Sequence, residues 1–342
     1  MSTTAVSSDA RDTEAPERRS VVNRYVLPAL ERYGLVILFV LLFLFFATLW
    51  DRPATFRSTD NIRSVLGTYS IPAILALAAI IPLVCGQFDL TVGPVAGLTA
   101  MATAGAFTNE GSPLWLAVVI ALALGLLVGV VNGYLVAYVK VNAFITTLGV
   151  SSLILGFVTL YSEGTAVLVS HEGLTNLGSL NWLGLPRLVF IVLAIALLTY
   201  YVLEHTPFGR YLHSVGSNPT AARLVGLDVD RLTFLTFVLS ALLASIAGVL
   251  LLARNGSADL QLGGLGLTLP ALAAAFLGAT AIRPGQFNVL GTLVAVLFVG
   301  FSLSGLNLNG ASSWVTDVFT GGTLVLAVAI STLVARHLAS SG

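Results

Sequence analysis

Residues 114–137 read LWLAVVIALALGLLVGVVNGYLVA, an apolar run long enough to cross a membrane. A membrane-spanning helix needs about 20 mostly apolar residues to cross roughly 30 Å of hydrocarbon. The rest of the chain has the same character, because 56% of its 342 residues are apolar and only 9% are charged. An ordinary soluble domain carries about 25% charged residues. The sequence therefore predicts an integral membrane protein.

Nine further apolar runs predict an all-α, polytopic membrane protein with about ten transmembrane helices. A chain of this length holds about that many spans when its loops are short. Several runs are short or rich in glycine and proline, which indicates broken helices packed inside protein rather than facing lipid. The predicted helices are Gly34–Leu49, Ile71–Cys85, Leu90–Phe107, Leu114–Ala137, Phe144–Leu160, Leu188–Leu203, Leu232–Leu252, Thr268–Ala281, Phe287–Leu306 and Val315–Val334.

One transmembrane domain is predicted for residues 34–336. Residues 1–33 are polar and predict a disordered cytoplasmic tail with a juxtamembrane stretch, and residues 337–342 are predicted to be a short C-terminal tail. The first apolar run ends at Trp50 and Asp51 and not at a small-residue cleavage site, so it is interpreted as a helix and not as a signal peptide.

The basic residues predict the orientation of the chain, because short cytoplasmic loops are enriched in lysine and arginine. With the N-terminus inside, eleven of the sixteen basic residues fall on the cytoplasmic side, so both termini are predicted to be cytoplasmic. The inner set is Arg11, Arg18, Arg19, Arg24, Arg32, Lys140, Arg210, Arg223, Arg231, Arg283 and Arg336, and the outer set is Arg52, Arg57, Arg63, Arg187 and Arg254.

The composition argues against several other functions. The net charge is zero and the basic residues form no dense cluster, so nothing indicates a nucleic-acid partner. Lys140 is the only lysine and follows no glycine-rich turn, so the chain has no phosphate-binding loop and any ATP must be hydrolysed by another chain. Cys85 is the only cysteine and the four histidines are scattered, so neither a disulfide nor a metal site is predicted. No cofactor is expected in this chain.

The longest internal polar segment, residues 204–231, is expected on the cytoplasmic side. A short, partly apolar helix is predicted within it over Thr220–Val225. A partly apolar helix at this place suits either a groove on a partner protein or the lipid headgroups, and the pattern alone leaves both open. The signals for this helix are a cap residue, a first-turn proline and a glycine stop, which are Asn218, Pro219 and Gly226.

An acidic residue interrupts two apolar runs in Gly86–Gly93, which reads GQFDLTVG. A carboxylate so near hydrocarbon is costly unless it faces water, a helix N-terminus or a partner. Asp89 is therefore predicted either to cap the following helix or to line a translocation pathway. A related string, GQFNVLG at Gly285–Gly291, indicates either a parallel duplication or a chance echo.

Other polar residues lie within or at the ends of the predicted helices. Their hydroxyls and amides suit a polyhydroxylated solute, and Phe144 offers a face for the carbon atoms of a sugar ring. Hydrogen bonds between helices explain such residues equally well. Together with Asp89 and Phe144, the predicted pathway residues are Asn132, Thr146, Thr147, Asn288 and Asn307.

These motifs resemble, in order from about residue 60 to the C-terminus, those of the ribose-type permeases of ATP-binding-cassette importers. The family's motifs are G-G-I-D-L-S-V-G, N-G…P-F-I-x-T-L, T-x-x-G-R…G-x-N…A-A…G and a late G-L-N-L. The similar segments here are Gly86–Gly93, Asn132–Gly133 with Phe144–Gly149, Thr206–Gly226, and Gly305–Leu308. Departures such as Gln87, Phe88 and Asn142 leave the identity of the sugar open.

The resemblance implies a permease subunit, not an enzyme, that moves a monosaccharide or similar polyol inward by alternating access in a bacterial inner membrane. It implies a second permease copy in a homo- or heterodimer, ATPase subunits that use ATP-Mg, and an extracytoplasmic solute-binding protein. It also implies that the helix at Thr220–Val225 docks into the ATPase. The residues predicted to couple to the ATPase are Gly209, Arg210, Gly216, Asn218, Pro219, Ala221, Ala222 and Gly226.

Other functions stay open. One is an importer of the same kind for branched amino acids or nucleosides. Another is an ion-coupled carrier that uses Asp89 or Asp317 as its proton or sodium group and needs no ATPase. A membrane enzyme is disfavoured, because the sequence shows no metal triad, activated nucleophile or paired carboxylates.

Overall fold

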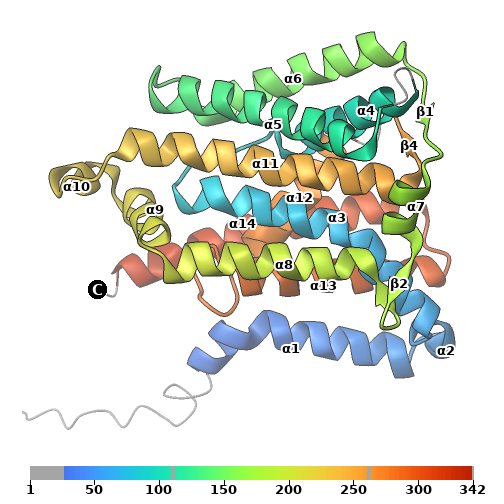
Figure 1. Ribbon diagram of the computed structural model, residues 1–342. Helices are drawn as coiled ribbons and strands as arrows, with labels where there is room; N and C mark the ends of the chain where they lie inside the picture. Colours follow the sequence, from blue (N-terminus) through green and yellow to red (C-terminus); the bar gives the residue numbers. More distant parts are fainter. Residues whose placement is uncertain (1–26, 109–111, 260–262, 341–342) are drawn as a thin grey trace, which may run out of the picture.

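The computed structural model describes residues 27–108, 112–259 and 263–340, with side chains from residue 32 to residue 329 (Figure 1). These residues form long helices that lie side by side. The only strands in the described segments are two antiparallel pairs of two-residue strands: β1 (Val167–Leu168) with β4 (Ser257–Ala258), and β2 (Asn181–Trp182) with β3 (Leu185–Pro186). The predicted all-α class is confirmed.

Each of the ten predicted helices has a counterpart in the described residues, and α5 has the predicted bounds. The helices are α1 (Leu27–Thr48), α3 (Thr59–Val84), α4 (Val92–Thr108), α5 (Leu114–Ala137), α6 (Ala143–Ser162), α8 (Arg187–Tyr200) with the π-helical turn η2 (Tyr201–His205), α11 (Val229–Asn255), α12 (Leu265–Gly278), α13 (Val289–Leu308) and α14 (Ser313–Ser340).

Several predicted boundaries were wrong because hydropathy marks only the apolar part of a helix. α3 begins at Thr59 and not at Ile71, since the Ser58 hydroxyl caps it by accepting a hydrogen bond from the Asn61 amide. α1 begins at Leu27, before the predicted Gly34, and α14 continues past the predicted end. The tail predicted for residues 1–26 lies outside the described residues.

Among the described residues, six helices are long and apolar enough to cross a membrane, which confirms a multi-pass membrane protein. They are α3, α5, α6, α8 with η2, α11 and α13. Four apolar stretches in the described chain are shorter, namely Arg32–Thr48, Val92–Thr108, Leu265–Gly278 and Ser313–Ala329. The two complete helices among these four, α4 and α12, bury half or more of their residues, so they fit the prediction of broken helices inside protein.

The helices α3, α11 and α13 lie at the centre of the bundle and bury about two thirds or more of their most apolar stretch, whereas α5, α6 and α8 bury about a third or less of theirs. Gly125, Gly129 and Gly133 place α5 directly against α11. A Cβ atom on any of the three would lie less than 3.0 Å from an α11 atom. Small residues at this spacing allow close helix packing where the hydrophobic effect gives no help.

Three short helices were not predicted: α2 (Pro53–Phe56), α7 (Glu172–Ser179) and α9 (Pro207–Ser217). The short helix predicted in the polar segment is present as α10 (Pro219–Leu224), one residue earlier than expected. Asn218 caps it by accepting a hydrogen bond from the Ala221 amide at 3.0 Å, and Gly226 follows it with a φ of +87°. The predicted cap, proline and stop are therefore confirmed.

The described basic residues of the two predicted sets lie at opposite ends of the bundle. Figure 1 shows α9 and α10 at one end, at left, beside the start of α1 and the end of α14, whereas α2, α7 and β2 are at the other end. Lys140, Arg223 and Arg283 of the predicted inner set belong to the first end, and Arg63 and Arg187 of the outer set belong to the second. The side chain of Arg336 lies outside the described residues.

Candidate functional site

A buried polar core surrounds Asp89, between α3 and α4. Asp89 is 1% exposed, and its carboxylate accepts three hydrogen bonds. The amide and hydroxyl of Thr91 donate to Oδ1 at 2.8 and 2.5 Å, and the hydroxyl of Ser240 in α11 donates to Oδ2 at 2.8 Å. The amide of Asn132 in α5 donates to the Thr91 hydroxyl at 3.0 Å. The core therefore links α5 and α11 to the turn before α4.

The backbone of this turn is held by hydroxyls from two other helices. Ser151 of α6 and Thr268 of α12 donate to the carbonyl of Leu90 at 3.0 and 3.3 Å. The amide of Gly93 in turn donates to the Thr268 hydroxyl at 3.1 Å. The first turns of α4 and α12 thus meet inside the protein, where a Cβ on Gly93 would lie less than 3.0 Å from the carbonyl of Gly264.

Asp89 lies at the N-terminal end of α4 without capping it in the strict sense. Its backbone donor is Thr91, the residue before the helix, and not an amide of the first turn. None of the ion pairs between described residues includes Asp89. When ionised, the carboxylate is stabilised by oriented hydroxyls and by the positive end of the helix dipole, in place of a cation.

The structure brings some predicted pathway residues into this core and leaves others apart. Asn132 joins Asp89, and its Oδ1 atom has no partner among the described residues. Thr147 is fully buried but donates to the Ala143 carbonyl of its own helix, and the buried Thr146 hydroxyl has no described partner. Phe144 is exposed at the start of α6.

The two predicted asparagines of the late segment lie at the two ends of α13. Asn288 is buried and caps the helix, because its Oδ1 accepts a hydrogen bond from the Gly291 amide at 2.7 Å. Its Nδ2 donates to the Ala281 carbonyl at 3.0 Å. Asn307 lies in the last turn of α13 and is exposed. Neither residue shares a hydrogen bond with Asp89.

Four members of the core were missed by the sequence prediction: Thr91, Ser151, Ser240 and Thr268. Ser240 stands in a helical series with Thr233 and Thr236 on the buried face of α11, a polar stripe in an apolar helix that is visible in the sequence.

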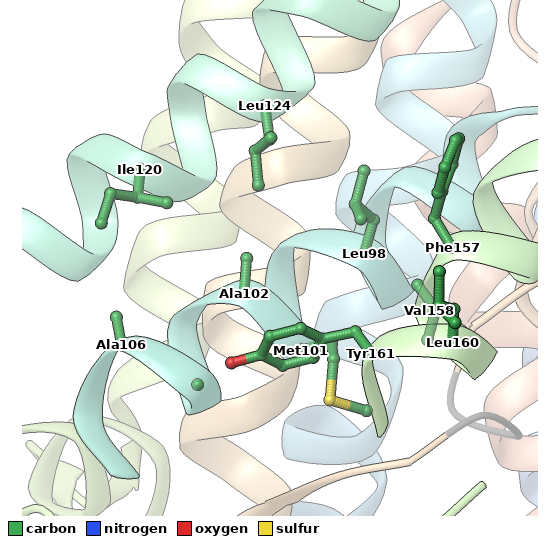
Figure 2. Close-up of a pocket in the computed structure, with 11 residues that line it drawn as sticks. Leu98, Met101, Ala102, Ala106, Ile120, Leu124, Phe157, Val158, Leu160 and Tyr161 are labelled. Carbon is green, nitrogen blue, oxygen red and sulfur yellow. The ribbon is translucent and has the colours of Figure 1, made fainter. Parts of the chain in front are cut away.

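A cavity of about 700 Å³ lies between α4, α5 and α6, away from the polar core (Figure 2). Its lining is aliphatic and aromatic, with the Tyr161 hydroxyl as the polar side-chain group. Tyr161 lies over Gly105, where a Cβ would be less than 3.0 Å from its hydroxyl. A polyol needs several hydrogen-bonding partners, so this cavity is poorly suited to one.

The α9–α10 segment presents an apolar tip at one end of the bundle. Leu224 is 85% exposed and Val225 77%, whereas Ala222 is buried at the base of α10. Asp230 at the start of α11 pairs with both Lys140 and Arg223, so α10 is tied to the α5–α6 connection. An exposed apolar helix that is fixed in place by ion pairs, as α10 is, has the form expected of a docking element.

Two of the predicted coupling glycines allow α9 to pack closely. A Cβ on Gly209 would lie less than 3.0 Å from the carbonyl of Leu203, and one on Gly216 would lie equally near the carbonyl of Val84, at the end of α3. Arg210, Pro219 and Ala221 are exposed on the same segment, next to the cap residue Asn218.

The other side of α9 carries charged and titratable groups. Glu204 in η2 pairs with Arg283, which lies between α12 and α13. Burial lowers the pKa of His213 in α9, an effect opposed by Glu204 and reinforced by Arg283. His213 therefore favours its neutral form, and the Glu204–Arg283 pair joins η2, which directly precedes α9, to the α12–α13 connection.

The broken helices, the buried polar core and the exposed apolar tip of the α9–α10 segment are features of a multi-pass membrane transport protein. Comparison with known families identifies it further: residues 61–328 match the model of the family described as the branched-chain amino acid transport system permease component. The chain belongs to this family. Its members are permease components, so the chain is a transport subunit and not an enzyme.

Curated relatives cover most of the chain. It is 35% identical over 308 residues to the ribose import permease protein RbsC of Escherichia coli strain K12, covering 88% of this chain and 93% of that one. It is 32% identical over 298 residues to the L-arabinose transport system permease protein AraH of the same strain, covering 87% and 89%. It is 36% identical over 263 residues to the autoinducer 2 import system permease protein LsrD of Klebsiella pneumoniae, covering 75% and 78%.

Proposed function

We propose that this chain is the permease subunit of an ATP-binding-cassette importer that moves a monosaccharide or similar polyol into a bacterial cell across its inner membrane. The observation that carries the proposal is the similarity, over nearly the whole length of both chains, to permeases named for ribose and L-arabinose import. The family description names branched-chain amino acids, which is the second candidate class of solute. The sugar-named relatives favour the first.

All ten apolar helices cross the membrane in this proposal, with both termini and the α9–α10 segment on the cytoplasmic side. The four shorter apolar helices lie beside the six long ones in the bundle (Figure 1). The basic residues support this orientation, because the described members of the predicted inner set, among them Lys140, Arg223 and Arg283, lie at the α9–α10 end.

ATP-Mg binds and is hydrolysed in separate ATPase subunits, and an extracytoplasmic binding protein delivers the solute. The exposed apolar tip of α10 fits a groove on the ATPase. Movement of α9 reaches the end of α3 through Gly216, and from there the turn that carries Asp89. The permease then alternates between conformations open to either side, as in other transporters with a site between broken helices.

The importer contains a second permease, identical or related, and α6 is the face we assign to it. The outer face of α6 carries small or hydroxylated residues, Gly149, Ser152, Gly156 and Thr159, of which the two glycines have no neighbour within 4 Å of a Cβ position. Large exposed side chains such as Leu153 and Leu160 flank this stripe on α6, whereas the exposed face of α5 lacks such a stripe and carries mainly large apolar side chains that suit lipid. Small residues on an exposed membrane helix allow another helix to approach closely.

Placing a charge at the base of α10 is expected to detach the ATPase. Ala222 is 4% exposed, so an Ala222→Asp change forces the small helix away from its seat. We expect at least tenfold less ATPase subunit to co-purify with a tagged permease, which quantitative immunoblotting measures. Ala166→Asp, at an exposed alanine of the opposite end, is the matched control and leaves the yield unchanged. Equal yields for both variants, or no ATPase with the unaltered chain, would contradict the proposal.

A further inference from the structure

The two related strings GQFD and GQFN form turns that share a left-handed glycine followed three residues later by a buried polar residue. We define the first turn as residues 85–91, between α3 and α4, and the second turn as residues 279–288, between α12 and α13. Gly86 and Gly285 both have left-handed backbone, with φ of +76° and +82°, which favours glycine. Asp89 and Asn288, which follow at equal spacing, are both buried and hydrogen-bonded. The echo in the sequence is therefore an echo in structure.

The phenylalanines of the two strings contact the same third ring. Phe88 of the first turn stacks on Phe276 of α12, with ring centroids 6.0 Å apart and an interplanar angle of 26°. Phe287 of the second turn meets Phe276 edge-on at 5.2 Å. These three residues, here called the aromatic clasp, join the two turns. Phe88 is 42% exposed, so this ring is able to leave its partner without opening the core.

The α9 helix contacts the first turn, and η2, which directly precedes α9, contacts the second turn. At its C-terminal end, the Cα of Gly216 lies 3.7 Å from a Cβ position on Gly86 in the first turn. Before its N-terminal end, Glu204 pairs with Arg283 in the second turn. A displacement of α9 together with η2 therefore acts on both turns, and the clasp joins these turns through Phe276.

We propose that Phe88, Phe276 and Phe287 are positioning residues for transport: the contact between Phe88 and Phe276 breaks during each cycle, while Phe287 keeps Phe276 in place. This inference rests on the function proposed above. Gly86 provides the backbone freedom for a hinge at the start of the first turn. Asp89 directly follows Phe88 and bonds Ser240 of α11, so opening the clasp changes the hydrogen bonds of the polar core.

A reversible cross-link tests whether the contact must open. Cys85 is the only cysteine, so Phe88→Cys and Phe276→Cys are placed in a Cys85→Ala background. The permease is purified with its ATPase, oxidised with copper phenanthroline, and assayed for ATP hydrolysis. We expect the cross-link to lower the hydrolysis rate at least tenfold and dithiothreitol to restore it. A contact that is only structural would not produce this reversible block.

The matched control is the pair Phe276→Cys and Phe287→Cys in the same background. This pair shares position 276 with the first pair, but it joins two residues whose rings stay together in the proposal. Its cross-link is therefore expected to change the rate of ATP hydrolysis less than twofold, compared with the same variant after dithiothreitol. The inference is overturned when the cross-linked Phe88–Phe276 pair hydrolyses ATP as fast as the same variant does after treatment with dithiothreitol. It is also overturned when this pair fails to cross-link while the control pair does. Absence of any ATPase from the unaltered preparation would instead contradict the proposed function, and the inference with it.

Discussion

Gly216→Leu is expected to abolish ATP-driven uptake while the permease still inserts and folds. Even a Cβ atom at this position would lie less than 3.0 Å from the carbonyl of Val84, and a leucine adds three further carbon atoms. Overpacking of this kind typically costs about 1–3 kcal/mol, which α9 relieves by moving away from α3. In the proposed coupling route the first turn receives its motion through this contact, so we expect hydrolysis to continue without transport and the solute moved per ATP to fall at least tenfold.

The measurement is the ratio of uptake to hydrolysis in proteoliposomes that contain the whole importer, with radiolabelled D-ribose as the probe and L-arabinose as the second solute. Gly34→Leu is the matched control, because nothing lies within 4 Å of a Cβ at Gly34. An unchanged ratio in the Gly216 variant would show that α9 and α3 need no close contact, and would contradict the coupling route.

Asp89→Ala is expected to destabilise the permease and to stop transport. The change leaves three buried donors from Thr91 and Ser240 without their acceptor. A buried polar group that loses its partner typically costs about 1–3 kcal/mol. Asp89→Asn keeps the shape and one acceptor oxygen, so we expect it to be less destabilised than the alanine variant and to lose at least tenfold in uptake if the carboxylate charge is required.

Thermal unfolding in detergent, followed by the loss of the monodisperse peak in size-exclusion chromatography, measures the first effect, and uptake measures the second. Asp60→Ala is the control, because the Asp60 side chain is 97% exposed. A melting temperature for Asp89→Ala equal to that of the control would mean that the buried network does not support the fold.

Hydropathy was sufficient to predict the ten helices. A single acidic residue between two apolar runs was sufficient to predict the turn at Asp89. Both signals are local, because a lipid-facing or buried helix must be apolar and a lone carboxylate stands out. The α10 helix was also found from local signals, the Asn218 cap and Pro219. The neighbouring α9, which was not predicted, begins with the same two signals, a cap at Thr206 and a proline at Pro207.

The partners of Asp89 were harder to predict, since they depend on how distant helices meet. Serine and threonine in apolar helices often bond to the preceding turn of their own helix, as Thr147 does, so the residue type alone does not reveal Ser240 or Thr268. The shared contact of Phe88 and Phe287 with Phe276 is a property of the tertiary fold as well. The sequence showed that the two strings are similar, but not that their phenylalanines contact the same ring.

The side of the membrane that α10 faces tests the central claim most directly. Leu224 is 85% exposed at the tip of α10, so Leu224→Cys in a Cys85→Ala background provides a single accessible thiol. A membrane-impermeant maleimide is expected to label it in inverted vesicles and not in intact cells, and the bound ATPase is expected to slow the labelling. Labelling in intact cells, with none in inverted vesicles, would place α10 outside and contradict the account.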